Sequence, residues 1–351
     1  MSETATANRR PTIADVAAAA QVSVATVNRV LSGKQAVRKA TARQVMDAAE
    51  TLGFYAARAI RIRTQAEQPR RSFGFLMQQR GRSLYQMLGN ELKAATLAST
   101  AVRGEAVVEH RDDLSPEATA ERLLKLGRNV DAIAVVSVDH PRITEAIERL
   151  RANQVPVVAV ISDLTASGRA GYVGLDNWKV GATAGWAMAK LCKKPGKIAV
   201  FVGNHRYLCQ DMCEIRFRSY FRERATEFQV LDAITTFEDS KNAYQSTLDL
   251  LHHTPDLVGL FIAGGGKTGV LRGLREDATG VAKNIAVVGL DLTPEARSGL
   301  LDGVVDVILS HPIKLLAETT VELLANATSG EANSEPVQRL LPFEIYTPEN
   351  L

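Results

Sequence analysis

The chain has no long hydrophobic run and little cysteine. No stretch of 18 or more apolar residues occurs in its 351 residues, so the sequence predicts no membrane-spanning helix. Residues 1–10 lack the apolar core of a secretory signal. The three cysteines, Cys192, Cys209 and Cys213, are too few for a disulfide framework and suit a reducing compartment. These absences predict a cytoplasmic protein with no membrane partner.

Charge is distributed unevenly along the chain. The net charge is only +3, but residues 1–71 hold 12 Lys and Arg against 5 Asp and Glu, whereas the remaining residues hold 30 against 34. A basic head on a mildly acidic body is typical of a polyanion-binding module joined to another unit. The length of 351 residues independently predicts two or three structural units.

The basic head contains the pattern of a helix-turn-helix. Residues 12–20 and 23–31 predict two short helices, for which Thr12 and Ser23 are suitable N-caps. A third helix, expected over residues 39–52, would close a small core. Two short helices joined by a tight turn are the motif that places its second helix in the major groove of DNA.

Three stretches of the head carry a resemblance to a known family. The strings TIADVA at residues 12–17, VSVATVNRVL at 22–31 and LGF at 52–54 resemble the head of the LacI/GalR repressors. The resemblance is close over about the first 60 residues and continues more weakly to the C-terminus. It implies two kinds of DNA contact: phosphate contacts by Thr12, Ser23, Thr26 and Asn28, and base contacts by Val24, Ala25 and Arg29.

The chemistry of these side chains suits those roles. Arg29 can donate two hydrogen bonds to guanine, and Val24 and Ala25 offer apolar contact, for example to a thymine methyl group. The family usually has serine at the position of Asn28, but an amide can also bond phosphate. Two alternatives stay open: the hydroxyl residues could serve only in capping and turns, and Arg29 could be a solvated surface arginine.

The resemblance also implies a hinge helix that wedges an apolar side chain into the minor groove. Simple counting places Arg63 at the wedge position, so we expect a shift of one residue that makes Ile62 the wedge, with Ile60 as second choice. Arg61 and Arg63 would then contact phosphate or the minor groove. The alternative is an ordinary basic linker. The expected domains are a disordered arm (1–10), the helix-turn-helix domain (11–56), the hinge helix and linker (57–71), and a two-lobed effector-binding and dimerisation core (72–351).

From residue 72 onward, short apolar runs alternate with amphipathic helices. Strands are expected at residues 73–77, 106–109, 132–136, 157–161, 172–175, 198–202, 231–235, 257–262, 285–288 and 304–309, and helices at 83–97, 116–126, 141–153, 179–192, 215–225, 241–251, 268–277 and 313–327. This alternation predicts parallel sheets covered on both faces. The number of strands favours two sheets.

The resemblance implies the same architecture for this body: two similar lobes with three crossings between them, similar to periplasmic sugar-binding proteins. The expected fold is therefore a small all-α helix-turn-helix domain followed by an α/β core of two doubly wound parallel-sheet lobes, periplasmic-binding-protein-like. Ligands in such folds bind beyond the carboxyl ends of the strands, in the crevice between the lobes.

Several side chains are candidates for holding an effector there. The resemblance places Asp176, Arg216, Asp291 and His311 where the family holds its effector, and carboxylates with a guanidinium can bind adjacent hydroxyls of a sugar. Tyr85 could supply a flat apolar face. The alternatives are helix capping by the two aspartates, a surface ion pair for the arginine, and no ligand contact for the histidine.

The strand expected at 257–262 is followed by AGGGKT, where many relatives in the family carry an Asn-Asp pair. This change removes a carboxylate and offers backbone amides together with a lysine, so Gly265 and Lys267 join the expected effector site. With Arg80, Arg82 and Arg206 near other strand ends, it suggests a negatively charged effector, such as a sugar acid or sugar phosphate.

Other site chemistries have weaker support. A phosphate-binding loop needs a glycine five residues before its Gly-Lys-Thr, and that position is Phe261. His205, Cys209 and Cys213 do not have a standard zinc spacing, although redox sensing by the two thiols stays open. No Ser-His-Asp or Gly-x-Ser-x-Gly arrangement stands out. We therefore expect no enzyme activity, no cofactor and no metal.

Together these patterns predict a sequence-specific transcription regulator, with repression the favoured mode. It would bind a pseudo-palindromic double-stranded operator as a homodimer, under allosteric control by a sugar or sugar derivative. The alternative is a cytosolic sugar-binding protein without a specific operator.

Overall fold

The computed structural model describes residues 10–32, 37–55, 68–329 and 335–351. The chain divides into two compact units, one containing the three N-terminal helices and the other both β-sheets. The units are described separately below. Within the described residues, none of the helices has the length and apolar character needed to cross a membrane.

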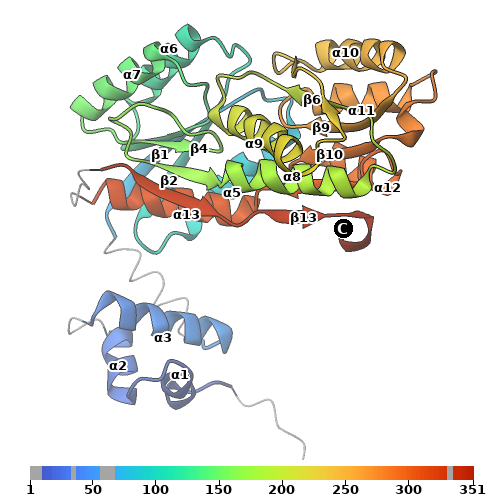
Figure 1. Ribbon diagram of the computed structural model, residues 1–351. Helices are drawn as coiled ribbons and strands as arrows, with labels where there is room; N and C mark the ends of the chain where they lie inside the picture. The colour runs from blue at the N-terminus through green and yellow to red at the C-terminus, as the bar shows by residue number, and fades with distance from the viewer. Residues whose placement is uncertain (1–9, 33–36, 56–67, 330–334) are drawn as a thin grey trace, which may run out of the picture. The chain divides into compact units, whose positions relative to one another are not determined.

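The head consists of α1 (Ile13–Ala19), α2 (Val24–Ser32) and α3 (Lys39–Thr51), drawn in blue in Figure 1. Its small core gathers one buried face from each helix, including Val16, Val27 and Ala49, with Phe54 packed after α3. The apolar side chains of Val16, Val27 and Ala49 have no exposed surface, and this shared burial stabilises helices that are too short to be stable alone. The three helices expected from the sequence are confirmed.

The first body lobe is built on one six-stranded sheet. Its strands are β1 (Arg70–Met77), β2 (Arg103–His110), β3 (Ala132–Val135), β4 (Val157–Val160), β5 (Gly171–Leu175) and β12 (Val337–Leu341), in the order β12-β5-β4-β3-β1-β2. Helices α6 (Pro116–Leu126) and α7 (Pro141–Ala152) pack together on one face. Helices α5 (Ser83–Ala98) and α13 (Ile313–Ala327) pack together on the other.

The second lobe repeats this plan. Its strands are β6 (Lys197–Val202), β7 (Gln229–Val230), β8 (Ile234–Thr235), β9 (Leu257–Ile262), β10 (Ala286–Leu290), β11 (Val307–Ser310) and β13 (Glu344–Tyr346), in the order β13-β11-β10-β9-β6-β7, with β8 also beside β6. Helices α8 (Asn177–Leu191) and α9 (Leu208–Arg224) cover one face, and α10 (Ser240–His253), α11 (Lys267–Arg275) and α12 (Pro294–Leu301) cover the other. Figure 1 shows α6 and α7 on one lobe and α10 and α11 on the other.

The chain crosses between the lobes three times, after β5, after β11 and after β12. The parallel strands of both sheets therefore direct their carboxyl ends towards the space between the lobes. This arrangement confirms the expected fold of two parallel-sheet α/β lobes. Strand β13 is antiparallel to β11 and forms an edge that the sequence patterns did not predict.

Two expected elements differ from the structure in ways that matter for the site. The strand expected at 231–235 is replaced by two two-residue strands, β7 and β8. Helix α9 begins at Leu208, seven residues before the expected start at 215. Its first turns bury polar residues as well as apolar ones, for example Gln210 and Glu214, so they lack the single apolar stripe by which a helix is usually found.

Candidate functional site

Helix α2 presents one face to solvent and buries the other. Val24, Ala25, Asn28 and Arg29 are exposed, whereas Val27 is fully buried in the core of the head. Among the described residues, the Arg29 side chain bonds within its own helix, from Nε to the Ala25 carbonyl at 3.3 Å and from Nη2 to Thr26 Oγ1 at 3.4 Å. Four of the five α2 side chains expected to meet DNA are thus exposed, and the fifth, Thr26, is half-buried.

The hydroxyl residues of the head serve as helix caps. Thr12 Oγ1 accepts from the Asp15 amide at 3.4 Å, and the Asp15 carboxylate accepts from the Thr12 amide at 2.7 Å, a reciprocal capping box. Ser23 Oγ accepts from the Thr26 amide at 3.1 Å and lies 2.9 Å from Thr26 Oγ1. The capping alternative is therefore realised, and it is compatible with phosphate contact. The hinge candidates Arg61, Ile62 and Arg63 lie outside the described residues.

In the body, a cavity of about 270 Å³ lies where the strands of both lobes end. Strand-end residues line it from the first lobe (Ile161, Leu175) and from the second (Ala263, Leu290, His311). This volume is at the lower end of the roughly 300–1,000 Å³ that small-molecule sites occupy. The cavity therefore suits a ligand of about one sugar ring rather than an oligosaccharide.

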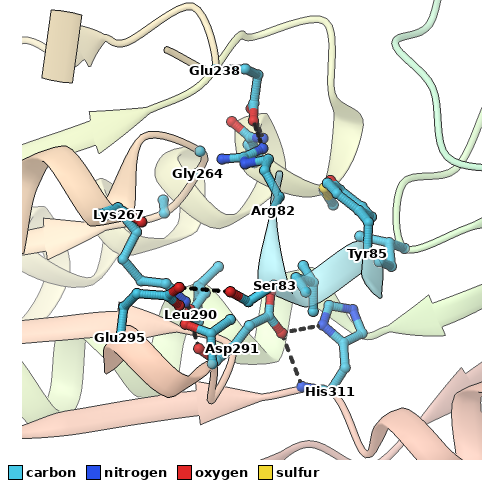
Figure 2. A pocket seen from close by; sticks show the side chains of 18 of the residues that line it. Arg82, Ser83, Tyr85, Glu238, Gly264, Lys267, Leu290, Asp291, Glu295 and His311 are labelled. Carbon is cyan, nitrogen blue, oxygen red and sulfur yellow. Dashed lines mark hydrogen bonds and ion pairs between the residues drawn. The ribbon is translucent and has the colours of Figure 1, made fainter. Parts of the chain in front are cut away.

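Asp291 and His311 form a buried pair at one side of this pocket, labelled in Figure 2. His311 Nδ1 lies 2.6 Å from Asp291 Oδ1, and the His311 amide donates to the same oxygen at 3.2 Å. Burial alone would raise the pKa of the Asp291 carboxyl, but the His311 imidazole and Lys267 hold it below its ordinary value. Because an ionised carboxylate can only accept, Nδ1 carries the proton. His311 Nε2 is buried and has no protein partner in the described chain, so it is available to a ligand.

Lys267 reaches the same region from the start of α11. Its Nζ donates to the carbonyls of Leu290 at 2.7 Å and Asp291 at 2.6 Å. Burial lowers the pKa of the ammonium to about 8, although Asp291 opposes the shift. Two of the three donors of the ammonium therefore bond to the backbone, and this geometry gives no support to the phosphate-cradling role that AGGGKT suggests.

A second polar group crosses the pocket from lobe to lobe. Arg82, just before α5 in the first lobe, pairs through Nη1 with Glu238 Oε2 of the second lobe, as Figure 2 shows. The other carboxylate oxygen accepts from Gln210 Nε2 at 2.8 Å, and Gln210 Oε1 accepts from the Gly203 amide at 2.6 Å. Burial by itself would lower the pKa of Arg82, but Glu238 raises it above its ordinary value. Ser83 adds a further contact, donating from Oγ to Glu295 Oε1 of α12 at 2.6 Å.

Glu238, Gln210 and Glu295 are pocket residues that the sequence patterns missed. Glu238 lies in the irregular connection between β8 and α10, where no periodic pattern operates. Gln210 lies in the first turns of α9, which the expected start of that helix excluded. The one available signal was the position of Arg82 near a strand end, and it did not identify a partner 156 residues away.

Five of the seven expected effector residues line the pocket: Tyr85, Gly265, Lys267, Asp291 and His311. Two do not. Asp176 is the N-cap of α8, accepting from the Lys179 amide at 3.2 Å. Arg216 lies two turns into α9, pairs with Glu223 at 3.1 Å, and places its guanidinium 5.4 Å from the centre of the Trp178 ring.

The charges in the pocket do not support the anionic effector that the glycine run suggested. Arg80 and Arg206 are not among the lining residues, and Arg82 is already paired. The lining contains two cations, Arg82 and Lys267, and three carboxylates, Glu238, Asp291 and Glu295. The carboxylate that the AGGGKT segment lacks is supplied by Glu238 from a different part of the chain.

The cysteines form neither a ligand set nor a reactive pair. Burial raises the pKa of Cys209 to about 12 and that of Cys213 well above its ordinary value, so both stay as thiols at neutral pH. His205, the third member of the possible ligand set, instead lies 3.0 Å from Asp211. These environments disfavour redox sensing by the two thiols.

Comparison with known proteins relates both parts of the chain to established groups. Residues 12–56 match the family model of bacterial regulatory proteins of the lacI family, and residues 73–332 match that of the periplasmic binding protein domain. No curated protein sequence gives a significant match.

Solved structures resemble the body in fold. GanP, a glucose-galactose binding protein from Geobacillus stearothermophilus, has a TM-score of 0.69 at 18% identity, covering 80% of this chain and 99% of its own. A solute binding protein of an ABC transporter from Burkholderia graminis, in complex with D-arabinose, has a TM-score of 0.71 at 19% identity, covering 79% and 96%. Another from Bacillus halodurans, with bound myo-inositol, has a TM-score of 0.70 at 20% identity, covering 81% and 96%.

Proposed function

Since the chain belongs to the lacI family of bacterial regulatory proteins and carries a periplasmic binding protein domain as its body, we propose that it is a transcription regulator whose hold on DNA is controlled by a small neutral effector. In this proposal the protein acts as a homodimer on a pseudo-palindromic operator, with repression as the default mode. We propose that it acts in the cytoplasm, where a bacterial chromosome lies.

The observation that carries the proposal is the exposed face of α2. A helix whose one side closes the core of the head while the other presents Val24, Ala25, Asn28 and Arg29 has the form of a recognition helix. Arg29 would read guanine with its forked donors, and the two apolar residues would contact base edges. Thr12, Ser23 and Thr26 would contact phosphates near the helix ends, where amides and hydroxyls favour anions. Arg61, Ile62 and Arg63 remain the proposed hinge contacts.

The pocket supports the second half of the proposal. Its polar atoms include His311 Nε2, which has no partner among the described residues. They combine with the apolar side chains of Ile161 and Leu175 in a cavity of about one-ring size. Such a mixture binds a polyhydroxylated ring, whose hydroxyls need partners and whose C–H faces need apolar contact. The solved structures of similar fold include proteins named for glucose and galactose or bound to D-arabinose and myo-inositol. We therefore propose a neutral monosaccharide or polyol as the effector.

Fluorescence anisotropy tests the DNA half directly. The full-length protein is titrated onto labelled duplexes enriched from a random pool, and the Arg29→Ala variant is compared with Arg43→Ala. Both substitutions remove one exposed positive charge from the head, but Arg43 lies on α3. We expect a loss of about 10–100-fold in affinity for Arg29→Ala, as for a lost bidentate base contact, and a much smaller loss for the control. Equal losses, or no enriched sequence, would reject the assignment of α2.

A panel of neutral monosaccharides and polyols, added to the same complex, tests the effector half. One class of compound should shift the DNA affinity, and the shift should disappear in Asp291→Asn without a change in DNA affinity itself. Coupling between two sites requires that the effector prefers one of two conformations of the body, so a compound that binds without altering DNA affinity would contradict allosteric control.

A further inference from the structure

The ion pair between Arg82 and Glu238 is built into the pocket by an unusual backbone. Phe237 and Glu238 both have left-handed backbone conformations, with φ of 55° and 60°, which residues with a side chain rarely adopt. Phe237 is 68% exposed, so packing of its ring does not account for the bend, whereas Glu238 is only 5% exposed. The bend places the Glu238 carboxylate in contact with Arg82 and Gln210.

Two glycines make room for that carboxylate. A Cβ on Gly203 would overlap Glu238 Oε1, and a Cβ on Gly265 would overlap Glu238 Oε2 and approach the Arg82 guanidinium. Neither glycine has a left-handed φ, so available space, rather than backbone conformation, requires glycine there. The carbonyl of Gly265 also accepts from Thr236 Oγ1 at 2.8 Å, which anchors the bent segment to the loop after β9. The glycine-rich loop after β9 thus leaves the space that the Glu238 carboxylate occupies.

The consequence is that Arg82 is held by the protein before any ligand arrives. Its partner carboxylate is fixed on its second oxygen by Gln210, and Gln210 is fixed in turn by the Gly203 amide. An acidic ligand would have to displace this network and would also lie close to Asp291 and Glu295. Placing a further anion among buried carboxylates is costly because the desolvated charges repel each other.

We propose that Glu238 is the specificity-determining residue of the pocket: by occupying Arg82 it admits neutral effectors and excludes sugar acids and sugar phosphates. The proposal rests on the function proposed above, namely that the pocket holds the effector. The same ion pair also links the two lobes across the cleft, since Arg82 belongs to the first lobe and Glu238 to the second.

The test replaces Glu238 by glutamine in the full-length protein, which preserves size and removes the charge. The matched control is Glu276→Gln, which removes the same charge from an exposed pair with Arg272 on α11. Binding of D-galactose and D-galacturonate, which differ by a carboxylate on the same ring, is measured by calorimetry. Thermal unfolding is recorded with and without inorganic phosphate, a probe of the freed Arg82 that requires no knowledge of the effector.

We expect Glu238→Gln to unfold at a lower temperature than the control and to regain part of the loss in phosphate, because an anion that binds the folded state stabilises it. We also expect its affinity for galacturonate to exceed that of the wild type at least tenfold. Stabilisation by phosphate no greater than in the control, or wild-type protein that binds galacturonate as well as galactose, would overturn the proposal. If no neutral compound binds the wild type while the variant gains anion binding, the effector assignment fails and the role of Glu238 stands.

A second pair of variants covers the case in which Glu238→Gln does not fold. Gly265→Ala should displace the carboxylate and lower the unfolding temperature, whereas the same substitution in a Glu238→Ala background should cost much less. Additive losses in the two backgrounds would show that Glu238 does not occupy the space beside Gly265, and the proposal would fall.

Discussion

Arg29 of the head and Arg82 of the body both belong to proposed binding sites, but their surroundings are opposite. Arg29 is exposed and bonds to Ala25 and Thr26 of its own helix. Arg82 is paired with a carboxylate from another lobe, 156 residues along the chain. The first arrangement leaves the guanidinium free to bond an incoming base. The second pairs the charge of the guanidinium with a protein carboxylate, and in our proposal this pairing excludes anionic ligands.

The difference extends to how each region tolerates change. The head is a small unit whose core depends on a few side chains, and the face of α2 that carries Arg29 is solvent-exposed. Substitutions on that face should alter DNA binding without unfolding the protein. The pocket is embedded between two lobes and its polar residues hold one another, so substitutions there should change stability and ligand preference together.

The largest effect should come from the core of the head. Val27→Asp places a carboxylate where no surface is exposed, and the cost of burying an unpaired charge exceeds what so small a core can offset. We expect DNA affinity to fall at least about a thousandfold as the recognition helix is lost, while unfolding of the body and effector binding remain unchanged. Anisotropy and circular dichroism measure the two effects. Gln44→Asp, an exposed position on α3, is the control, and a comparable loss there would contradict the argument.

The next effect should come from the pocket. Asp291→Asn removes the ionised acceptor that orients His311. A hydrogen bond to a charged group contributes about 1.5–3 kcal/mol, so we expect effector affinity to fall by roughly 10–100-fold, with DNA affinity unchanged. Calorimetry with the compound found in the panel provides the measurement. An equal fall for Asp176→Asn, which alters the aspartate outside the pocket, would show that the pocket is misplaced.

A smaller effect should separate base reading from charge in the head. Arg29→Lys keeps the positive charge but loses the forked donors. We expect about a tenfold loss on the preferred sequence and little loss on random DNA, with the same salt dependence. Competition binding at several salt concentrations tests this, and a parallel loss on both kinds of DNA would assign Arg29 to phosphate rather than bases.

The smallest effect should appear in the pH dependence of stability. Burial lowers the pKa of Lys267 in the folded protein to about 8, from its ordinary value of 10.5. Between these values the unfolded chain binds the proton and the folded protein does not, so this group makes stability rise with pH. We expect wild type to gain about 1 kcal/mol relative to Lys267→Met between pH 7 and 8.5. Urea unfolding checks the slope, and the exposed Lys314→Met should show no such difference from wild type.

Sequence patterns were sufficient where neighbouring residues determine the outcome. The caps at Thr12 and Ser23, the apolar spacing that ends in the buried Val27, and the β/α alternation of the body are all local signals. The structure has most of the helices and strands they predict, with the strand at 231–235 as an exception. Local signals failed at the start of α9, where Arg216 was expected in the pocket and Gln210 stands there instead.

The sequence by itself determined the type of most elements and the side chains that α2 offers, because those depend on contacts a few residues apart. Only the tertiary structure decided the chemistry of the pocket. Arg82, Gly203, the bend at Phe237 and Glu238, and Gly265 come from four separate parts of the chain. The charges of Arg82 and Glu238 are paired only because the two lobes bring them together. No pattern along the chain records which buried carboxylate will meet which arginine.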